Sequence, residues 1–251
     1  MVKETRILMG MPITVEIVDE EATGDILQKV FKYFSYVDNK FSTYKDSSEI
    51  MAINRGELSE SEWSEDMKEI FALSEETRLA TKGYFDIRKP DGSLDPSGIV
   101  KGWAIRNAGR IISREGFKNF YVDVAGDIEA RGKNSKGSPW IVGIRNPFNR
   151  NENVKIISLN NMGMATSGTY IRGQHIYNPH NPGPIKEIVS LTVIGPDIYE
   201  ADRFATPAFA MGKKGIYFIE NLPGFEGYMI DKDGIAIETT SFSDYVIKNN
   251  A

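Results

Sequence analysis

The stretch of chain that decides the fold class is 97-SGIVKGWAIRNAGRIISREGFKNFYVDVAGDIEAR-131. Its first half predicts a helix over 97–115, because apolar residues recur there at three- and four-residue steps. Its second half predicts short strands at 120–124 and 128–131, rich in β-branched and aromatic residues and separated by glycine. A helix followed by short strands and tight turns favours the α+β class with an antiparallel sheet.

The segments on both sides continue this mixture. The alternating residues of 13–18 predict an edge or surface strand, and Thr23 can cap a helix whose apolar face runs over 26–37. The remaining expected elements are helices at 64–81, 200–211 and 213–221, and strands at 140–145, 154–159, 188–194 and 228–231.

Length, composition and charge limit the class of protein. The 251 residues are 41% hydrophobic and 26% charged, which is typical of a globular chain with a large core. A protein with a formal charge of -5 does not attract a polyanion, so a nucleic-acid partner is disfavoured. The first apolar runs are too short for a signal or membrane segment, so we expect a soluble chain without a membrane span, and its compartment stays open. Since no linker or repeat divides it, we expect one domain over 1–251.

The chain contains no cysteine and two histidines. This excludes disulfides, thiol catalysis, iron–sulfur clusters and four-ligand Cys/His zinc sites. A bound metal ion must therefore be held by oxygen. The dinucleotide, P-loop and nucleophile-elbow signatures are also missing, so a bound nucleotide requires another geometry.

Asp202 and Thr206 are the first candidates for oxygen ligands. They are four residues apart, which places them on one face of a helical turn, and Mg²⁺ prefers such hard oxygens. The alternative is that Asp202 begins a helix and Thr206 is a surface hydroxyl. Inside a helix the ring of Pro207 would clash with the carbonyl of Arg203, so we expect the helix to begin late or to kink.

A second candidate is the turn 94–98 with Lys101. A small turn at a helix N-terminus offers free backbone N–H groups to phosphate, and Lys101 adds positive charge. The alternative is a Ser-capped helix with a solvated lysine. Tyr44 offers a flat ring for stacking or belongs to the core, and 83–87 joins an aromatic pair to a carboxylate.

The two histidines differ in their surroundings. The segments 165–170 and 175–179 are expected to form polar loops. His175 lies in this hydroxyl-rich sequence and is the candidate general base, because an unperturbed imidazole titrates near neutrality. The alternative is a solvated loop histidine. His180, between Pro179 and Asn181, is expected on the surface of a turn.

Taken in order, these and neighbouring segments resemble the ApbE family, the FAD:protein FMN transferases. The matching segments are MGMPITVEI (9–17), FSTYKDSSEIMAIN (41–54), GYFDI (83–87), LDPSGIVKGWA (94–104), YVDVAGDIEARG (121–132), WIVGIRNP (140–147), MATSGTY (164–170), HIYNP (175–179), VSLTVIGP (189–196) and EADRFATPAFAMG (200–212). They cover most of the chain, and their order carries the resemblance.

The resemblance implies a two-part, T-fold-related α+β architecture with antiparallel sheets flanked by helices. FAD is expected in the cleft between the parts, with Mg²⁺ on its pyrophosphate. The positions that match FAD contacts are Met9, Tyr44, Tyr84, Phe85, Asp86, Asp95, Lys101 and Tyr177. Those that match metal ligands are Gly98, through its backbone oxygen, Asp202 and Thr206. The sequence departs from the family at Ala205, where the residue can be acidic, and at Ala125, where glycine is usual.

The implied reaction is Mg²⁺-dependent transfer of FMN from FAD to a Thr or Ser hydroxyl, with release of AMP. We expect His175 to accept the proton of that hydroxyl. The acceptor is expected to be a flavoprotein, such as a subunit of a redox-driven ion pump or a flavin-carrying reductase. Two alternatives stay open: Mg²⁺-dependent hydrolysis of FAD to FMN and AMP, and FAD binding without turnover.

The family's export signal and lipid-bearing cysteine are missing from this sequence. This fits a cytoplasmic protein, or an exported and lipid-anchored one whose signal was removed.

Overall fold

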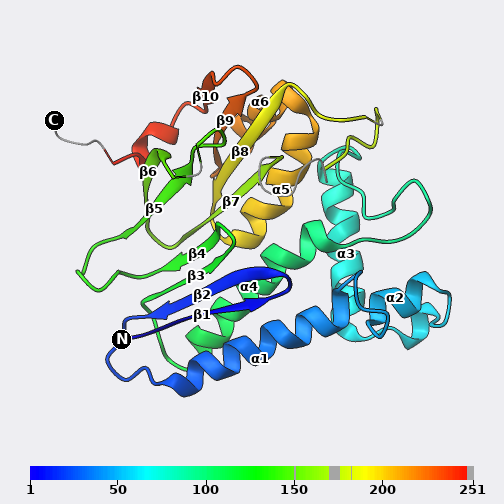
Figure 1. Cartoon of the computed structure of the whole chain (residues 1–251), viewed down its shortest axis with the longest axis horizontal. Helices are drawn as coiled ribbons and strands as arrows, with labels where there is room; N and C mark the ends of the chain where they lie inside the picture. The colour runs from blue at the N-terminus through cyan, green and yellow to red at the C-terminus, as the bar shows by residue number, and fades with distance from the viewer. Residues whose placement is uncertain (150, 170–175, 182, 248–251) are drawn as a thin grey trace.

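The computed structural model describes residues 1–149, 151–169, 176–181 and 183–247. Within these ranges its largest element is an eight-stranded sheet in the order β1-β2-β3-β4-β7-β8-β9-β10, in which every neighbouring pair is antiparallel (Figure 1). Its strands are β1 (Val2–Leu8), β2 (Met11–Ile17), β3 (Phe120–Val124), β4 (Asp127–Arg131), β7 (Met162–Gly168), β8 (Ile188–Gly195), β9 (Glu226–Asp231) and β10 (Ala236–Glu238). A separate antiparallel pair consists of β5 (Trp140–Arg145) and β6 (Asn153–Leu159).

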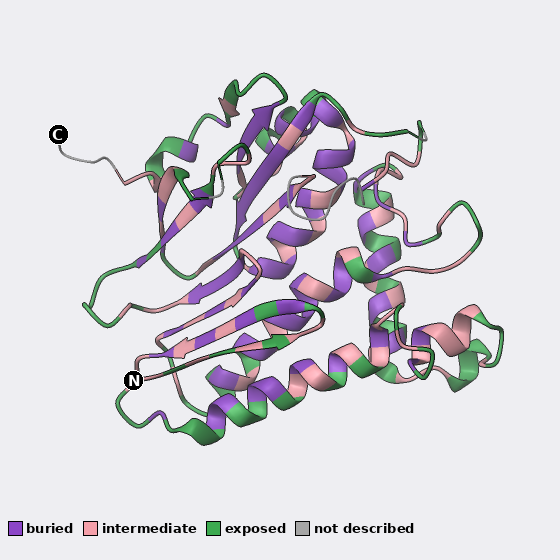
Figure 2. Cartoon of the chain, viewed as in Figure 1, coloured by how far each residue is buried: buried purple, intermediate pink, exposed green. Residues whose placement is uncertain are grey.

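Helices cover one face of the large sheet. They are α1 (Gly24–Phe41), α2 (Glu49–Asn54), α3 (Glu65–Ala80), α4 (Ser97–Arg114), α5 (Ile198–Ala210) and α6 (Gly215–Glu220). Of these, α1, α4, α5 and α6 contact strands of the sheet, and the buried sides of α1, α4 and α5 face it in Figure 2. Thr23 caps α1 as predicted, since its hydroxyl accepts from Asp25 N. Among the described residues, no helix is both long enough and apolar enough to cross a membrane.

The large sheet separates two hydrophobic cores. The larger core lies between the sheet and the helices, and the smaller one lies between the opposite face and the β5–β6 pair. Strand β4 shows the alternation that creates this division. Ile128 and Ala130 belong to the smaller core, whereas Asp127 and Glu129 bond to groups of α4 and α5 on the other face. Two buried carboxylates are thereby placed beneath the helices.

Two tight turns bring the strand ends close to α4. Met9 and Gly10 connect β1 to β2 with φ values of 53° and 70°, and Ala125 and Gly126 connect β3 to β4 with 54° and 100°. Positive φ at both central residues is the conformation that matches the twist of a two-residue hairpin. Ala125 N also donates to Pro12 O at 3.1 Å, which ties the second turn to the first hairpin.

The α+β class and the antiparallel sheet flanked by helices are confirmed, and three local expectations need correction. The strand at 13–18 is not at an edge, because β1 pairs along its outer side. The segment 165–168, expected as a polar loop, is the end of β7. That strand is rich in small residues for a packing reason: a Cβ on Gly163 would lie 2.1 Å from Ile198 N. The helix expected at 213–221 is divided into a 3₁₀ turn, Gly212–Lys214, and α6.

Candidate functional site

A cavity of about 600 Å³ opens where the two hairpin turns, the N-terminus of α4 and the middle of α5 meet. This volume lies in the range of about 300–1,000 Å³ that is typical of ligand sites. All the predicted site residues within the described ranges line it, namely Met9, Tyr44, Tyr84, Phe85, Asp86, Asp95, Gly98, Lys101, Tyr177, Asp202 and Thr206. His175 lies outside the described residues.

One side of the cavity, which we call the helix wall, consists of Gly98, Lys101, Asp127, Asp202 and Thr206. These residues come from α4, β4 and α5, all regular elements packed on the larger core. A second group of lining residues, which we call the loop wall, consists of Tyr44, Tyr84, Asp86, Asp95 and Tyr177. These residues lie outside the helices and the large sheet.

Asp202 is one of two almost fully buried carboxylates in the helix wall, the other being Asp127. Asp202 lies in the interior of α5, which begins at Ile198, and the residue is 3% exposed. The readings of Asp202 as a helix-start residue and of a late helix start are therefore wrong, and Pro207 lies within the helix. Asp202 Oδ2 accepts a hydrogen bond from Gly102 N at 2.8 Å.

Gly102 permits this contact because it has no side chain. A Cβ there would lie 2.8 Å from Asp202 Cβ and 3.1 Å from Ile198 O. In a regular helix the amide of Gly102 donates to the carbonyl four residues earlier, which is that of Gly98. Asp202 therefore competes for this amide with the carbonyl of Gly98, a residue that lines the cavity.

The charges of the helix wall are paired. The Lys101 ammonium forms an ion pair with Asp127 and lies 3.6 Å from Asp202 Oδ1. Asp127 Oδ1 accepts from Thr166 N at 2.9 Å, which connects β4 to β7. Burial raises the pKa of the Asp202 carboxyl to about 7, although the Lys101 charge opposes this rise. A positive charge next to these carboxylates is therefore favourable.

The oxygens of the helix wall fit a hard divalent cation. Asp202 supplies a carboxylate, Thr206 a hydroxyl 3.4 Å from Ser167 Oγ, and Gly98 a carbonyl. Within the described ranges, no three His, Cys, Asp or Glu side chains gather in a metal-binding cluster. A metal ion would thus depend on mixed oxygen donors rather than on carboxylates alone. Ala205 is fully buried in the core and has no side-chain oxygen for a metal ion.

Phe85 connects the two walls. Its amide donates to Thr81 Oγ1 at 3.2 Å, and Thr81 in turn donates to Thr77 O at 2.8 Å, so the end of α3 fixes the position of Phe85. The ring covers the first turn of α4, because a Cβ on Gly98 would lie 2.9 Å from Phe85 Cε2. Only glycine at 98 lets the ring approach this closely.

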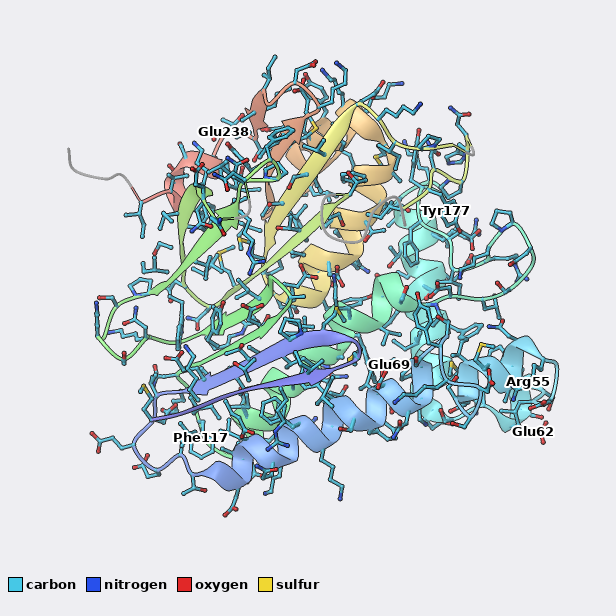
Figure 3. The ribbon with its side chains drawn as sticks, in the orientation of Figure 1. Arg55, Glu62, Glu69, Phe117, Tyr177 and Glu238 are labelled. Atoms are coloured by element: carbon cyan, nitrogen blue, oxygen red, sulfur yellow. The ribbon has the colours of Figure 1, made fainter. Side chains whose placement is uncertain are left out.

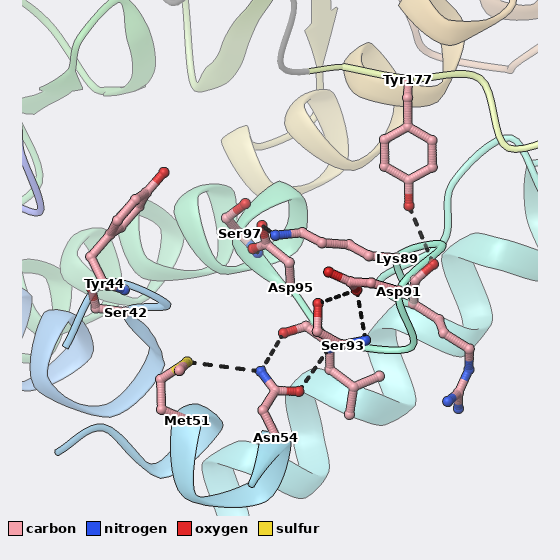
Figure 4. Close-up of polar contacts among 12 residues, drawn as sticks. Ser42, Tyr44, Met51, Asn54, Lys89, Asp91, Ser93, Asp95, Ser97 and Tyr177 are labelled. Carbon is pink, nitrogen blue, oxygen red and sulfur yellow. Dashed lines mark hydrogen bonds and ion pairs between the residues drawn. The ribbon is translucent and has the colours of Figure 1, made fainter. Parts of the chain in front are cut away.

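The centre of the loop wall is the hairpin 86–95. Lys89 Nζ lies 2.9 Å from Asp95 Oδ2, and Ser97 N donates to Asp95 Oδ1 at 3.1 Å (Figure 4). Burial alone would raise the pKa of Asp95, but the hydrogen bonds from Lys89 and Ser97 outweigh it and hold the pKa below its usual value. Asp95 is therefore an anion at neutral pH.

Tyr177 holds the hairpin from the opposite side. In Figure 3 it lies where the segment before β8 meets the end of α3, and its hydroxyl donates to Asp86 O at 3.2 Å and to Arg88 O at 3.3 Å. Tyr44 stands at the rim with 97% of its surface exposed, so its ring is open to stacking and does not belong to the core. His180 lies in an exposed turn, as expected, with its ring 4.6 Å from that of Tyr84.

Sequence reasoning missed Asp127 as a member of the site. The residue follows the Ala125-Gly126 turn directly, and a carboxylate on the helix-facing side of a strand was the available signal. Ser167 was placed in a polar loop, whereas it ends β7 beside Thr206.

Solved structures with this fold cover nearly the whole chain. The flavin transferase ApbE of Vibrio cholerae matches with a TM-score of 0.85 and 22% identity over 97% of this chain and 98% of that one. An ApbE protein of Thermotoga maritima matches with a TM-score of 0.87 and 19% identity over 98% of this chain and 99% of that one. These likenesses show the fold.

Sequence comparison extends the likeness. The sequence model of the ApbE family matches residues 9–89 and 87–229. The FAD:protein FMN transferase of Escherichia coli K12 is 31% identical over 166 residues, which are 62% of this chain and 47% of that protein. The FAD:protein FMN transferase of Klebsiella pneumoniae is 33% identical over 160 residues, or 60% and 46%. The chain spans about half the length of the curated relatives it matches.

Proposed function

Because the chain belongs to the ApbE family, we propose that it transfers FMN from FAD to a Thr or Ser hydroxyl of an acceptor flavoprotein and releases AMP. The acceptor is a protein such as a subunit of a redox-driven ion pump or a flavin-carrying reductase. The single observation that supports this most is one cavity with aromatic rings on one side and buried, charge-paired oxygens on the other. A flavin dinucleotide carries both a flat ring and a pyrophosphate, and each side suits one of them.

The reaction forms one bond and breaks one. The acceptor oxygen bonds to the phosphorus on the FMN side, the bond from this phosphorus to the bridging oxygen breaks, and AMP leaves with that oxygen. In this proposal the ring of Tyr44 holds the flavin, and Lys101, fixed by Asp127, binds a pyrophosphate oxygen. The proton of the hydroxyl goes to a general base, for which His175 remains the prediction.

Gly98 O, Asp202 and Thr206 are the groups that would hold Mg²⁺ in this scheme. When bound, the ion supplies positive charge to the pyrophosphate, where phosphoryl transfer concentrates negative charge. Asp202 is held toward this place by Gly102 N, and Thr206 by its neighbour Ser167.

The test incubates the protein with FAD, Mg²⁺ and a flavin-accepting domain, and follows the mass of the acceptor. We expect an increase equal to one FMN phosphoester, abolished by a chelator and by replacing the acceptor Thr or Ser with Ala. AMP release at the same rate without acceptor would identify a hydrolase instead. FAD binding with neither product would identify a flavin-binding protein without turnover.

A further inference from the structure

Asn54, the last residue of α2, makes two hydrogen bonds to the hairpin 86–95, which carries Asp86 and Asp95 of the loop wall. Its Nδ2 donates to Leu94 O at 2.9 Å, and its Oδ1 accepts from Leu94 N at 2.8 Å (Figure 4). The two residues are 40 positions apart in the chain. Asn54 lies behind the hairpin and outside the cavity lining, so it can act on a ligand only through the residues it holds.

The hairpin needs such a partner because of its own pairing. Arg88 and Leu94 face each other in an antiparallel bridge, and the hairpin hydrogen bonds flank them: Lys89 N to Ser93 O at 2.8 Å and Asp95 N to Ile87 O at 2.8 Å. The N–H and C=O of Leu94 consequently point away from the hairpin, as in the outer edge of a sheet. The carboxamide of Asn54 pairs with both, as the peptide group of a further strand would.

Helix α2 is a firm base for this contact. Its first residue, Glu49, accepts from Ser64 N at 2.7 Å and from the Ser64 hydroxyl, and pairs with Lys40, which ties α2 to α3 and α1. The buried Ser48, which caps α2, donates to Ser42 O at 2.7 Å, at the base of the segment that carries Tyr44. The two ends of α2 therefore hold two separate parts of the loop wall.

We propose that Asn54 is a positioning residue: by pairing with the backbone of Leu94 it holds the hairpin 86–95, and with it Asp86 and Asp95, in the arrangement that receives FAD. Asp95 follows Leu94 directly, so movement of the Leu94 backbone moves this carboxylate. The inference rests on the proposed function in taking FAD as the ligand. Without the contact, the hairpin also populates conformations that do not bind FAD. The apparent affinity for FAD then falls in proportion to the population that remains in the binding conformation.

The experiment compares wild type with Asn54→Ala and Asn54→Asp. Asn54→Ala removes both hydrogen bonds. Asn54→Asp keeps the acceptor for Leu94 N but places a second oxygen against Leu94 O, and it is nearly isosteric, so it serves if the alanine variant folds poorly. Asn221→Asp is the matched control, since it removes one surface hydrogen bond, to Tyr217 O. FAD affinity is measured by flavin fluorescence in the presence of a chelator, and amide hydrogen exchange is followed in parallel.

For both Asn54 variants we expect FAD to bind about tenfold more weakly, as loss of about one to two net hydrogen bonds implies. We expect amides in 87–95 to exchange faster, while those of α4 and α5 keep their wild-type rates. In turnover, KM for FAD rises and kcat is unchanged, because the helix wall is untouched. Unchanged exchange in 87–95, or faster exchange with wild-type FAD affinity, overturns the proposal.

Failure of the proposed function is recognised separately. If the wild-type protein binds FAD but transfers no FMN, the proposed function is wrong. The comparison of FAD affinity and hydrogen exchange between wild type and the Asn54 variants still tests the role of Asn54.

Discussion

The helix wall and the loop wall of the cavity differ in how far their key residues are buried and in how their charges are paired. Asp202 in the helix wall is 3% exposed, and its charge is balanced by a neighbouring lysine and a backbone amide. Tyr44 in the loop wall is 97% exposed and contributes nothing to the core. A buried charge acts strongly because little water screens it, but it must be paired to be tolerated. A ring that recognises another ring needs only to remain accessible. The proposed function accordingly assigns charge stabilisation to residues of the regular elements and stacking of the flavin to a residue of the loops.

The largest effect that tests this contrast is expected for Asp202→Asn. The variant keeps an oxygen for Gly102 N and removes the negative charge, so the fold is retained. We expect kcat/KM for FMN transfer to fall by about 10³-fold or more, since several kcal/mol of charge stabilisation is lost. Asp233→Asn, at an exposed aspartate paired with Lys232, is the matched control. Retention of even a tenth of wild-type activity at saturating Mg²⁺ would show that charge in the helix wall is not essential.

The same carboxyl predicts a pH dependence of stability in the metal-free protein. Its pKa is raised from 3.8 to about 7, chiefly by burial. Between these two pH values the folded state keeps the proton, whereas the unfolded chain has lost it. The contribution of this carboxyl to stability is therefore present at low pH and is lost as pH rises toward about 7. Relative to wild type, the unfolding free energy of Asp202→Asn should rise across this interval. Urea titrations with chelator at several pH values test this, and parallel profiles for the two proteins contradict it.

A smaller effect is expected when the packing behind Asp202 is disturbed. In Gly102→Ala the new methyl would lie 2.8 Å from Asp202 Cβ and 3.1 Å from Ile198 O, so α4 and α5 must separate. We expect the unfolding free energy to fall by about 1–3 kcal/mol and transfer activity to fall with it. Gly24→Ala is the control, because a Cβ there meets nothing within 4 Å. Thermal unfolding at the wild-type temperature would mean that this contact does not set the position of Asp202.

Substitution of Tyr44 in the loop wall is expected to weaken FAD binding and to leave the stability of the fold nearly unchanged. We expect Tyr44→Ala to weaken FAD binding by about fivefold to tenfold, the value of one aromatic contact, and to leave the unfolding free energy within about 0.5 kcal/mol. Tyr44→Phe should bind FAD as the wild type does. Tyr217→Ala, at a tyrosine of α6 that is 63% exposed and outside the cavity lining, provides the control. Equal FAD affinities for the two alanine variants would rule out stacking on Tyr44.

The elements that periodicity predicted well are those with large apolar residues. Helices α1 and α4 and strands β3 and β5 appear where the sequence indicates them, because their spacing reflects burial against the large sheet. Strand β7 escaped notice because close contact with the start of α5 requires Gly163, and small residues give no alternating signal. Helix α5 was expected to begin late or to kink because Pro207 was judged by local sterics alone, whereas it begins at Ile198.

The site was predictable residue by residue and not in its connections. Spacing suggested Asp202 with Thr206, and the family resemblance added further residues that line the same cavity, but neither identified Asp127. The contacts that orient these residues join positions far apart in sequence: Gly102 with Asp202, and Asn54 with Leu94. No local pattern encodes such pairs, since each depends on how separate elements pack.

The smallest effect is expected at the turn that brings β4 to the cavity, where the sequence departs from its family. Ala125 has a φ of 54°, which is unfavourable for a residue with a Cβ, whereas Gly126 beside it adopts 100° freely. We expect Ala125→Gly to raise the unfolding free energy by up to about 1 kcal/mol, because relief of strain slightly exceeds the added entropy of the unfolded chain. In Ala72→Gly, an exposed position inside α3, the same change should destabilise by about 1 kcal/mol. If both variants lose stability equally, the turn carries no strain, and the position of Asp127 in the helix wall does not depend on it.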